Sequence, residues 1–302
     1  MEEKRVCIIT GANSGIGKEA VQQIGRAGHH VIMACRSVER GESALAGLQP
    51  RAPDLSAEVM QVDLGLQASV RAFATAVKSR FPRVDVLIHN AAVFDVSQNE
   101  RRLTDEGIET TWSTNHLGPV LLTGLLLEPL MASQDGRVIT ISSQGLVAMP
   151  RLRVALDDPE FEKRPFSVTK AYYQSKRAQV MYTRWLARRL MGTPVTANCI
   201  RVTAVKVDLE RHAGLSPFKR WVYSIKARMA FEPAEMAQTY TWLATSPDLA
   251  GVSGRYFNEK QREVHDVPYS EDASNIDAVM ALSARYVPEL KEVLHSGSKA
   301  TH

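Results

Sequence analysis

The stretch KAYYQSKRA, residues 170–178, places two tyrosines directly ahead of a lysine. Tyr172 lies four residues before Lys176 and Tyr173 lies three before it, so either phenol could meet the ammonium group on one helix face. A tyrosine has a reference pKa of about 10, and a nearby ammonium group favours the phenolate and lowers that pKa. Such a phenol can donate and accept protons at moderate pH, which predicts a general acid–base catalyst.

Helix geometry separates the two tyrosines, because successive helical residues turn by about 100°. Tyr172 and Lys176 lie about 40° apart, on one flank of the apolar stripe of this helix. Tyr173 is expected to point away from the sheet, as a packing or interface residue. The stripe itself contains Ala171, Ala178, Tyr182 and Trp185.

Short apolar runs alternate with amphipathic stretches along most of the chain. We expect strands at 5–10, 30–35, 57–62, 84–89, 137–142 and 195–200, and helices at about 15–28, 38–48, 67–80, 104–131 and 168–191. Near-continuous apolar strands that alternate with helices predict an α/β fold, a doubly wound parallel sheet with helices on both faces. A terminal helical extension is expected over about 271–295, interrupted at Pro288.

Composition narrows the class of protein. The chain has 302 residues, 44% hydrophobic and 23% charged, which is typical of a globular protein. The net charge of +4 comes from basic residues spread along the chain, so a nucleic-acid partner has little support. No run of eighteen apolar residues predicts a transmembrane segment, and the eight histidines form no metal-binding motif. Three widely spaced cysteines in apolar runs, Cys7, Cys35 and Cys199, fit a reducing cytoplasm.

The first predicted strand runs into the glycine-rich turn TGANSGIGKEA. Gly11 permits a tight turn, while Gly15 and Gly17 let the backbone approach a pyrophosphate at the start of the next helix. The position between strand and helix favours a dinucleotide site over a glycine-rich turn without a ligand.

Two further strand ends could contact such a dinucleotide. The second strand ends at Arg36, where an NAD-binding chain usually has an acidic residue. A guanidinium group suits a 2′-phosphate, so we predict NADP (NADPH) rather than NAD, the alternative being a solvated surface charge. The third strand ends at Asp63, which could bind an adenine amino group, cap the next helix, or do both.

These motifs resemble the short-chain dehydrogenase/reductase family, and most of all its retinol dehydrogenase and WW-domain oxidoreductase branch. TGANSGIG, VDL, HNAA, TNHLGPVLLT, VITISS and AYYQSKRA occur in the family's order over roughly residues 5–290. The resemblance implies one Rossmann-type domain over 1–302 and a catalytic tetrad of Asn115, Ser143, Tyr172 and Lys176. It also implies cofactor contacts at Asn13, Ser14, Ile16, Leu64, Asn90, Ala91, Ala92, Tyr172, Lys176 and Val205.

The resemblance also implies a role for each member of the tetrad. Ser143 would hold the carbonyl oxygen, although Ser142 is adjacent and serines after strands are often only turn residues. Asn115 would kink its helix and hold a water that links Lys176 to solvent. Lys176 would bind the nicotinamide ribose.

The chain departs from the family after the sixth strand. Val202 and Thr203 occupy the positions of a family Pro-Gly, and Val207 that of a threonine. A β-branched residue does not readily adopt the positive φ that glycine allows. We therefore expect a different loop path, altered seating of the nicotinamide and reduced or narrowed activity.

The segment 203–231 mixes aromatic and basic residues. We expect it to be a lid over an apolar substrate. The alternatives are peripheral membrane contact through 211–231 and a surface helix packed on its own domain.

The sequence as a whole predicts an NADP-dependent oxidoreductase for a small lipophilic carbonyl or alcohol substrate, such as a retinal-like, aromatic or aliphatic aldehyde or ketone. A homodimer or another homo-oligomer is expected. The alternative is a nucleotide-binding regulator or scaffold with weakened chemistry, which fold alone does not exclude.

Overall fold

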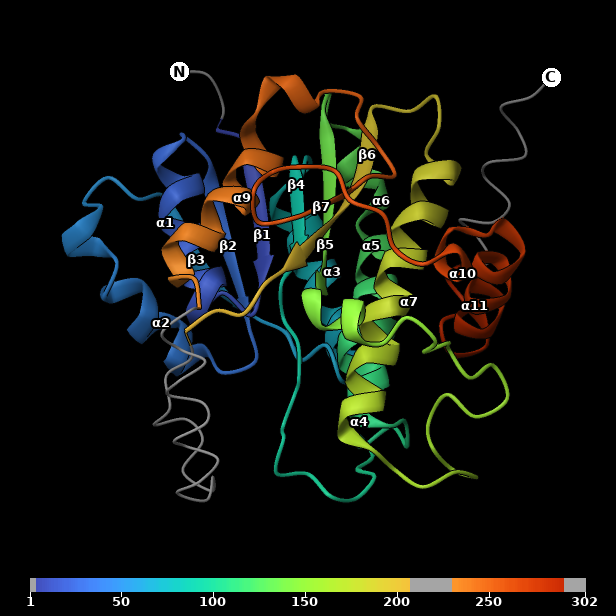
Figure 1. The fold of residues 1–302 in the computed structure, drawn as a ribbon. Coiled ribbons are helices and arrows are strands. Elements are labelled where there is room, and N and C mark those ends of the chain that lie inside the picture. The colour runs from blue at the N-terminus through green and yellow to red at the C-terminus, as the bar shows by residue number, and fades with distance from the viewer. Residues whose placement is uncertain (1–3, 207–229, 291–302) are drawn as a thin grey trace.

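The computed structural model describes residues 4–206 and 230–290. Seven parallel strands form one sheet in the order β3-β2-β1-β4-β5-β6-β7 (Figure 1). Strands are added outward from β1 to β3 on one side of the sheet and from β4 to β7 on the other. In such sheets a ligand crevice opens at the carboxyl ends of the strands where the strand order switches, here between β1 and β4. The strands are β1 (Val6–Thr10), β2 (His30–Cys35), β3 (Ala57–Gln61), β4 (Val86–His89), β5 (Gly136–Ser143), β6 (Val195–Val202) and β7 (Tyr256–Phe257).

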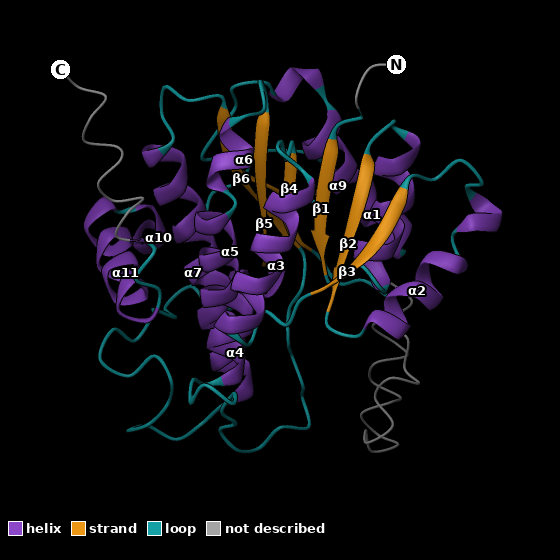
Figure 2. Cartoon of the chain, turned by 180° about the vertical axis from the view of Figure 1, so that it is seen from behind, coloured by secondary structure: helices purple, strands orange, loops and turns teal. Residues whose placement is uncertain are grey.

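Helices cover both faces of this sheet (Figures 1 and 2). On one face α1 (Gly15–Arg26), α2 (Val38–Ala46) and α9 (Pro233–Thr245) bury one apolar cluster. On the other face α3 (Gln67–Arg80), α5 (Gly118–Leu125) and α7 (Val168–Arg189) bury a second one. Shorter or outer helices are α4 (Thr110–Trp112), α6 (Leu127–Met131), α10 (Pro268–Glu271) and α11 (Ala273–Tyr286), the last packed against α7.

The predicted fold class is confirmed, and all six predicted strands are present with ends within two residues of their expected positions. Three of the described elements were missed: β7, α9 and the four-residue helix α10. The strand β7 has only two residues, too few for a recognisable pattern, and α9 follows a segment that we interpreted only as a lid. Residues 207–229, which contain most of that predicted lid, the predicted membrane-contact segment and Val207, lie outside the described residues.

The predicted helix over 104–131 begins six residues later than expected. The buried side chain of Glu109 accepts hydrogen bonds from the backbone N–H groups of Thr111 and Trp112, which fixes the helix start at residue 110. A π-helical turn, Ser113–Leu117, then interrupts the α-helical pattern. Such turns are frequent at functional sites, and this one contains Asn115.

The other helix predictions agree closely with the structure. The predicted stripe of α7 is buried, at Ala171, Ala178, Tyr182 and Trp185. In the predicted terminal extension, α11 ends at Tyr286, ahead of Pro288, and residues beyond 290 lie outside the described ranges. Cys7, Cys35 and Cys199 are buried and free. Within 4–206 and 230–290, every helix is too short or too polar to cross a membrane.

Candidate active site

A cavity of about 330 Å³ opens at the carboxyl ends of β1 to β4. Nine of the predicted cofactor residues line it: Gly11, Asn13, Ser14, Arg36, Asp63, Leu64, Asn90, Ala91 and Ala92. The other lining residues are Thr10, Ala34, Val62, Val93 and Thr114. Sequence reasoning missed these five, although four of them adjoin predicted positions. The cavity lining does not include the remaining predicted cofactor contacts, which are Gly15, Ile16, Gly17, Tyr172, Lys176 and Val205.

The glycine turn is shaped to accept a ligand. Gly11 and Gly15 have positive φ angles of 65° and 55°. A Cβ atom on Gly11 would lie 2.9 Å from the Cα of Ala91, and one on Gly17 would lie 2.5 Å from the Nδ2 of Asn90. A Cβ atom on Gly15 would enter open space. The side chain of Ser14 does not cap α1, so the helix N-terminus keeps backbone donors that suit a pyrophosphate.

Asn90 supports this turn from the neighbouring strand. Its amide nitrogen donates to the carbonyl oxygens of Thr10 (2.9 Å) and Gly11 (3.2 Å). Its amide oxygen accepts from the Tyr240 hydroxyl of α9 at 3.2 Å. Asn90 therefore fixes the glycine turn to β4 and to a helix on the opposite side of the turn.

Arg36 and Asp63 both line the cavity, and they follow β2 and β3 respectively. Arg36 is exposed, so its guanidinium group can reach a ligand at the mouth. The carboxylate of Asp63 accepts the Gly65 N–H at 2.8 Å, which closes a turn before α3. Of the two alternatives for Asp63, capping of α3 is not observed. Glu106 has that role from a distant loop, accepting the N–H groups of Gln67 and Ala68.

The structure brings Tyr172, Ser143 and Lys176 together beside this cavity. The Ser143 side chain lies close enough to the Tyr172 hydroxyl to favour its phenolate and oppose the rise in its pKa. The Nζ of Lys176 lies 5.6 Å from the centre of the Tyr172 ring and donates to the Ile141 carbonyl oxygen at 2.9 Å. One turn of α7 and the end of β5 thus supply a phenol, a hydroxyl and an ammonium group.

The electrostatics differ from the expectation. Burial raises the pKa of Tyr172 to about 12, with Tyr173 adding to the rise and the Ser143 side chain opposing it. Burial also lowers the pKa of Lys176 to about 8. The pKa of Tyr172 is therefore raised overall and not lowered as expected, because loss of solvation dominates at both groups.

The neighbouring serines are separated as the sequence indicated. The hydroxyl of Ser142 donates to the Lys176 carbonyl oxygen at 3.2 Å and is buried between β5 and α7. Ser143 is half-buried and lies beside Tyr172. Of the two, Ser143 is therefore the one that lies beside the Tyr172 hydroxyl.

Asn115 lies in the π-helical turn, as the expected kink requires. Its amide binds both backbone groups of Val93: the oxygen accepts the N–H at 2.7 Å and the nitrogen donates to the carbonyl oxygen at 3.0 Å. The same nitrogen is 3.2 Å from the Ser175 hydroxyl, which donates to the Tyr172 carbonyl oxygen at 2.7 Å. Asn115 thus connects the cavity wall to the backbone of Tyr172.

The prediction that Tyr173 points away from the sheet was wrong. Its ring packs against Gly145, directly after β5, where a Cβ atom would collide with the phenol. It also makes an edge contact with Tyr172, with ring centres 5.1 Å apart. The turn after β5 reaches back over α7, so a residue off the apolar stripe still meets the strand end. Tyr173 is a packing residue, as expected, but it packs beside the site.

The segment after β6 follows a path that needs no glycine. Val202 pairs with Ser143 at the end of the β5–β6 ladder, and Thr203 is not in the left-handed region. The Thr203 hydroxyl donates to the side-chain oxygen of Gln144. Val205 forms a bridge with Phe231. A side-chain hydrogen bond therefore joins the two segments that leave β5 and β6.

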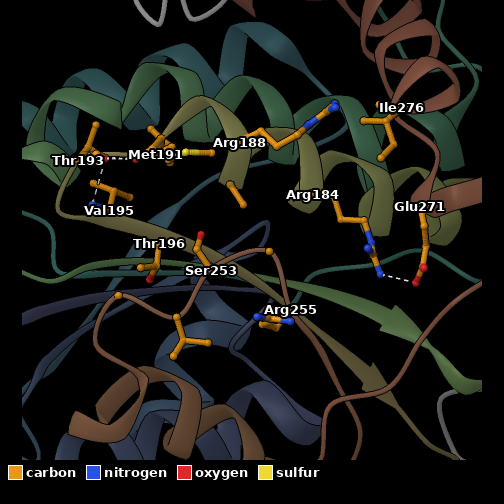
Figure 3. A pocket seen from close by; sticks show the side chains of 17 residues that line it. Arg184, Arg188, Met191, Thr193, Val195, Thr196, Ser253, Arg255, Glu271 and Ile276 are labelled. Carbon is orange, nitrogen blue, oxygen red and sulfur yellow. Dashed lines mark hydrogen bonds and ion pairs between the residues drawn. The ribbon is translucent and has the colours of Figure 1, made fainter. Parts of the chain in front are cut away.

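A larger cavity, of about 720 Å³, lies at the opposite end of the sheet, between the last turns of α7, the start of β6 and the segment 251–255 (Figure 3). Its three arginines each pair with a carboxylate: Arg184 with Glu271, Arg188 with Asp277, and Arg255 with Glu263. It contains none of the predicted site residues. We place the candidate site beside the smaller cavity, because nine predicted cofactor residues line that cavity and its lining residue Val93 binds the Asn115 amide. No cluster of metal-ligating side chains occurs within 4–206 and 230–290.

Comparisons with known proteins agree with this geometry. A family model described as short chain dehydrogenase matches residues 5–154. The chain is 35% identical to human retinol dehydrogenase 13 over 94% of its own length and 84% of that protein's. It is 37% identical to mouse retinol dehydrogenase 14 over 86% and 79% of the two lengths.

Among solved structures, an uncharacterized protein from Mycobacterium paratuberculosis superimposes with a TM-score of 0.69 at 30% identity, covering 94% of this chain and 93% of that one. A short chain dehydrogenase from Shigella flexneri complexed with NADP gives a TM-score of 0.64 at 22% identity, covering 85% and 97%. The chain belongs to the short-chain dehydrogenase/reductase family of NAD(P)-dependent oxidoreductases.

Proposed function

We propose that this protein is an NADPH-dependent oxidoreductase that interconverts a lipophilic carbonyl compound and its alcohol, with Asn115, Ser143, Tyr172 and Lys176 as the working groups. The observation that carries the proposal is the convergence of the Tyr172 hydroxyl, the Ser143 hydroxyl and the Lys176 ammonium group at the edge of the dinucleotide cavity. A carbonyl group needs a proton donor at its oxygen when hydride reaches its carbon, and this arrangement offers one.

The residues divide the work as follows. When bound, the nicotinamide supplies or accepts the hydride. Ser143 donates a hydrogen bond to the carbonyl oxygen and orients it toward Tyr172. Tyr172, whose raised pKa keeps it protonated at neutral pH, donates its proton to that oxygen. Lys176 stabilises the resulting phenolate electrostatically while it carries its own charge. In the oxidation direction the same groups act in reverse.

The cofactor preference rests on Arg36. The cavity lining, the open space at Gly15 and the free donors of α1 suit a dinucleotide. Arg36 lies at its mouth, where a guanidinium group can bind the two oxygens of a 2′-phosphate. The NADP complex of the Shigella flexneri neighbour is consistent with this preference.

The lipophilic substrate class rests on two observations. The relatives with 34–37% identity are named retinol dehydrogenases, and retinol is a lipophilic alcohol. In this chain the rings of Phe94 and Tyr173 both contact the ring of Tyr172. The side chain of Val147, in the segment after Ser143, is 63% exposed. A polar substrate would find few partners among these side chains.

A second candidate function is a cofactor-binding regulator with weakened turnover. The observation that favours it is the replacement of the family Pro-Gly by Val202 and Thr203, beside Ser143. Tight NADPH binding with no turnover across aromatic and aliphatic aldehydes, ketones and quinones would support this candidate over the enzyme.

We further propose one domain over 1–302, a homodimer or other homo-oligomer, and a cytoplasmic location. The three free buried cysteines support a reducing compartment.

Removal of one phenolic hydroxyl group at a time tests the assignment of Tyr172 as the proton donor. Tyr172→Phe should lower kcat by about 100- to 10,000-fold, because it removes the proton donor and leaves the ring. Tyr173→Phe is the matched control and should retain kcat within about threefold, since it keeps the ring that contacts Tyr172 and leaves the Tyr172 hydroxyl in place. Steady-state kinetics with NADPH measure both variants, and equal losses would refute the assignment.

Charge reversal tests the cofactor preference. Arg36→Glu should raise the Kd for NADPH roughly 100-fold and leave the Kd for NADH within a few-fold, because only NADPH has the 2′-phosphate. Fluorescence titration of the reduced cofactors measures both constants. Arg40→Glu, on the exposed face of α2 outside the cavity lining, is the control for general charge effects. An unchanged NADPH/NADH ratio in Arg36→Glu would contradict the assignment.

Removal of one hydroxyl tests the connection between the segments after β5 and β6. Thr203→Val should lower kcat about three- to tenfold, because it loses the hydrogen bond to Gln144 beside Ser143. Thr203→Ser keeps the hydroxyl and should retain activity. If the bond is the cause, Gln144→Leu should lower kcat similarly and add little to Thr203→Val. Fully additive losses would contradict a direct connection.

A further inference from the structure

The ring of Phe94 stacks on the ring of Tyr172. The ring centres are 4.3 Å apart and the planes are inclined by 27°. These centres are closer than those of the Trp112–His116 pair, which lie 4.5 Å apart. Offset stacking of this kind is favourable in its own right. Phe94 also contacts Tyr173, with ring centres 6.4 Å apart. The Tyr172 ring therefore contacts two rings that also contact each other, and one of these, Phe94, lies on a different segment of the chain.

The backbone that carries Phe94 is fixed at the preceding residue. Both polar backbone groups of Val93 bind the Asn115 amide, at 2.7 and 3.0 Å. Asn115 is 2% exposed and lies in the π-helical turn, so it is itself rigidly placed. A residue directly after such a two-point contact has little freedom to move its Cα atom. The position of Phe94 against Tyr172 thus follows from Asn115.

Asn115 also connects to the backbone of Tyr172 through Ser175. Its amide nitrogen meets the Ser175 hydroxyl, which donates to the carbonyl oxygen of Tyr172. The backbone of Tyr172 is thereby restrained through Ser175, and its ring is restrained through Phe94. Val93 lines the dinucleotide cavity, so the same segment continues from the cavity wall to the ring that bears the reactive hydroxyl.

We propose that Phe94 is a positioning residue: held by Asn115 through Val93, it fixes the Tyr172 ring so that the hydroxyl stays at Ser143. The expected effect on kcat rests on the proposed function. The expected effect on the position of the Tyr172 ring rests on the stacking geometry alone. Proton transfer depends on placement within tenths of an ångström, so a loosened ring lowers kcat more than it lowers affinity.

Kinetics test the consequence. Phe94→Ala should lower kcat roughly tenfold, with KM changed less than about twofold, for the smallest carbonyl compound that the unchanged enzyme reduces. Phe94→Tyr keeps the ring and should restore kcat. Phe81→Leu removes a ring from another stacked pair, with His30 at the far end of β2, and is the control. An unchanged kcat in Phe94→Ala, or an equal loss in Phe94→Tyr, would overturn the proposal.

Fluorine NMR of protein labelled with 3-fluorotyrosine tests the positioning without turnover. The Tyr172 resonance is assigned by its loss in Tyr172→Phe. It should be shifted and broadened in Phe94→Ala and in Asn115→Ala, and unchanged in Phe81→Leu. An unperturbed resonance in Phe94→Ala overturns the proposal even if kcat falls. If the unchanged protein reduces no carbonyl compound, the proposed function fails, while this resonance still decides whether Phe94 positions Tyr172.

Discussion

The structure of the site depends on one buried charge. The ammonium group of Lys176 is enclosed between α7 and β5, where its described hydrogen-bond acceptor is the carbonyl oxygen of Ile141. Burying a charge is costly unless it is paired or hydrogen bonded, and here the cost appears as a pKa lowered to about 8. The same contact fixes the register between helix and strand, so that Tyr172, one turn earlier, meets Ser143 at the strand end.

The rest of the site is arranged around that contact. The sheet order brings the ends of β1 to β4 together in one cavity, while β5 ends beside it with Ser143. The π-helical turn directs Asn115 at Val93 and Ser175, which connects the cavity wall to α7. These contacts restrain the reactive phenol from several directions. Restraint of this kind keeps reacting groups oriented before substrate arrives, which is the main contribution of a protein scaffold to proton and hydride transfer.

Much of this site could be predicted from the sequence, since strand and helix patterns place Gly11, Arg36, Asp63, Asn90 and Ser143 at strand ends. The spacing of Tyr172 and Lys176 on α7 was equally informative. Contacts between distant segments could not be predicted: Glu106 caps α3, Glu109 delays a helix start, and Phe94 covers Tyr172. The helical pattern also did not predict the contacts of the Tyr173 ring, because these depend on the turn at Gly145. The pKa values depend on burial, which spacing along a helix does not reveal.

The central claim is that the buried Lys176 ammonium group supports proton donation by Tyr172, and the pH dependence of carbonyl reduction tests it most directly. The pKa of Lys176 is lowered to about 8, so the group is charged below that pH and neutral above it. Tyr172, with a pKa of about 12, stays protonated throughout. At saturating NADPH, kcat/KM should be level from mildly acidic pH to neutrality and should fall as pH rises through about 8. In Lys176→Arg, whose charge persists, the residual activity should lack this fall. A profile that stays level to pH 10 in the unchanged enzyme, or the same fall in Lys176→Arg, would contradict the claim.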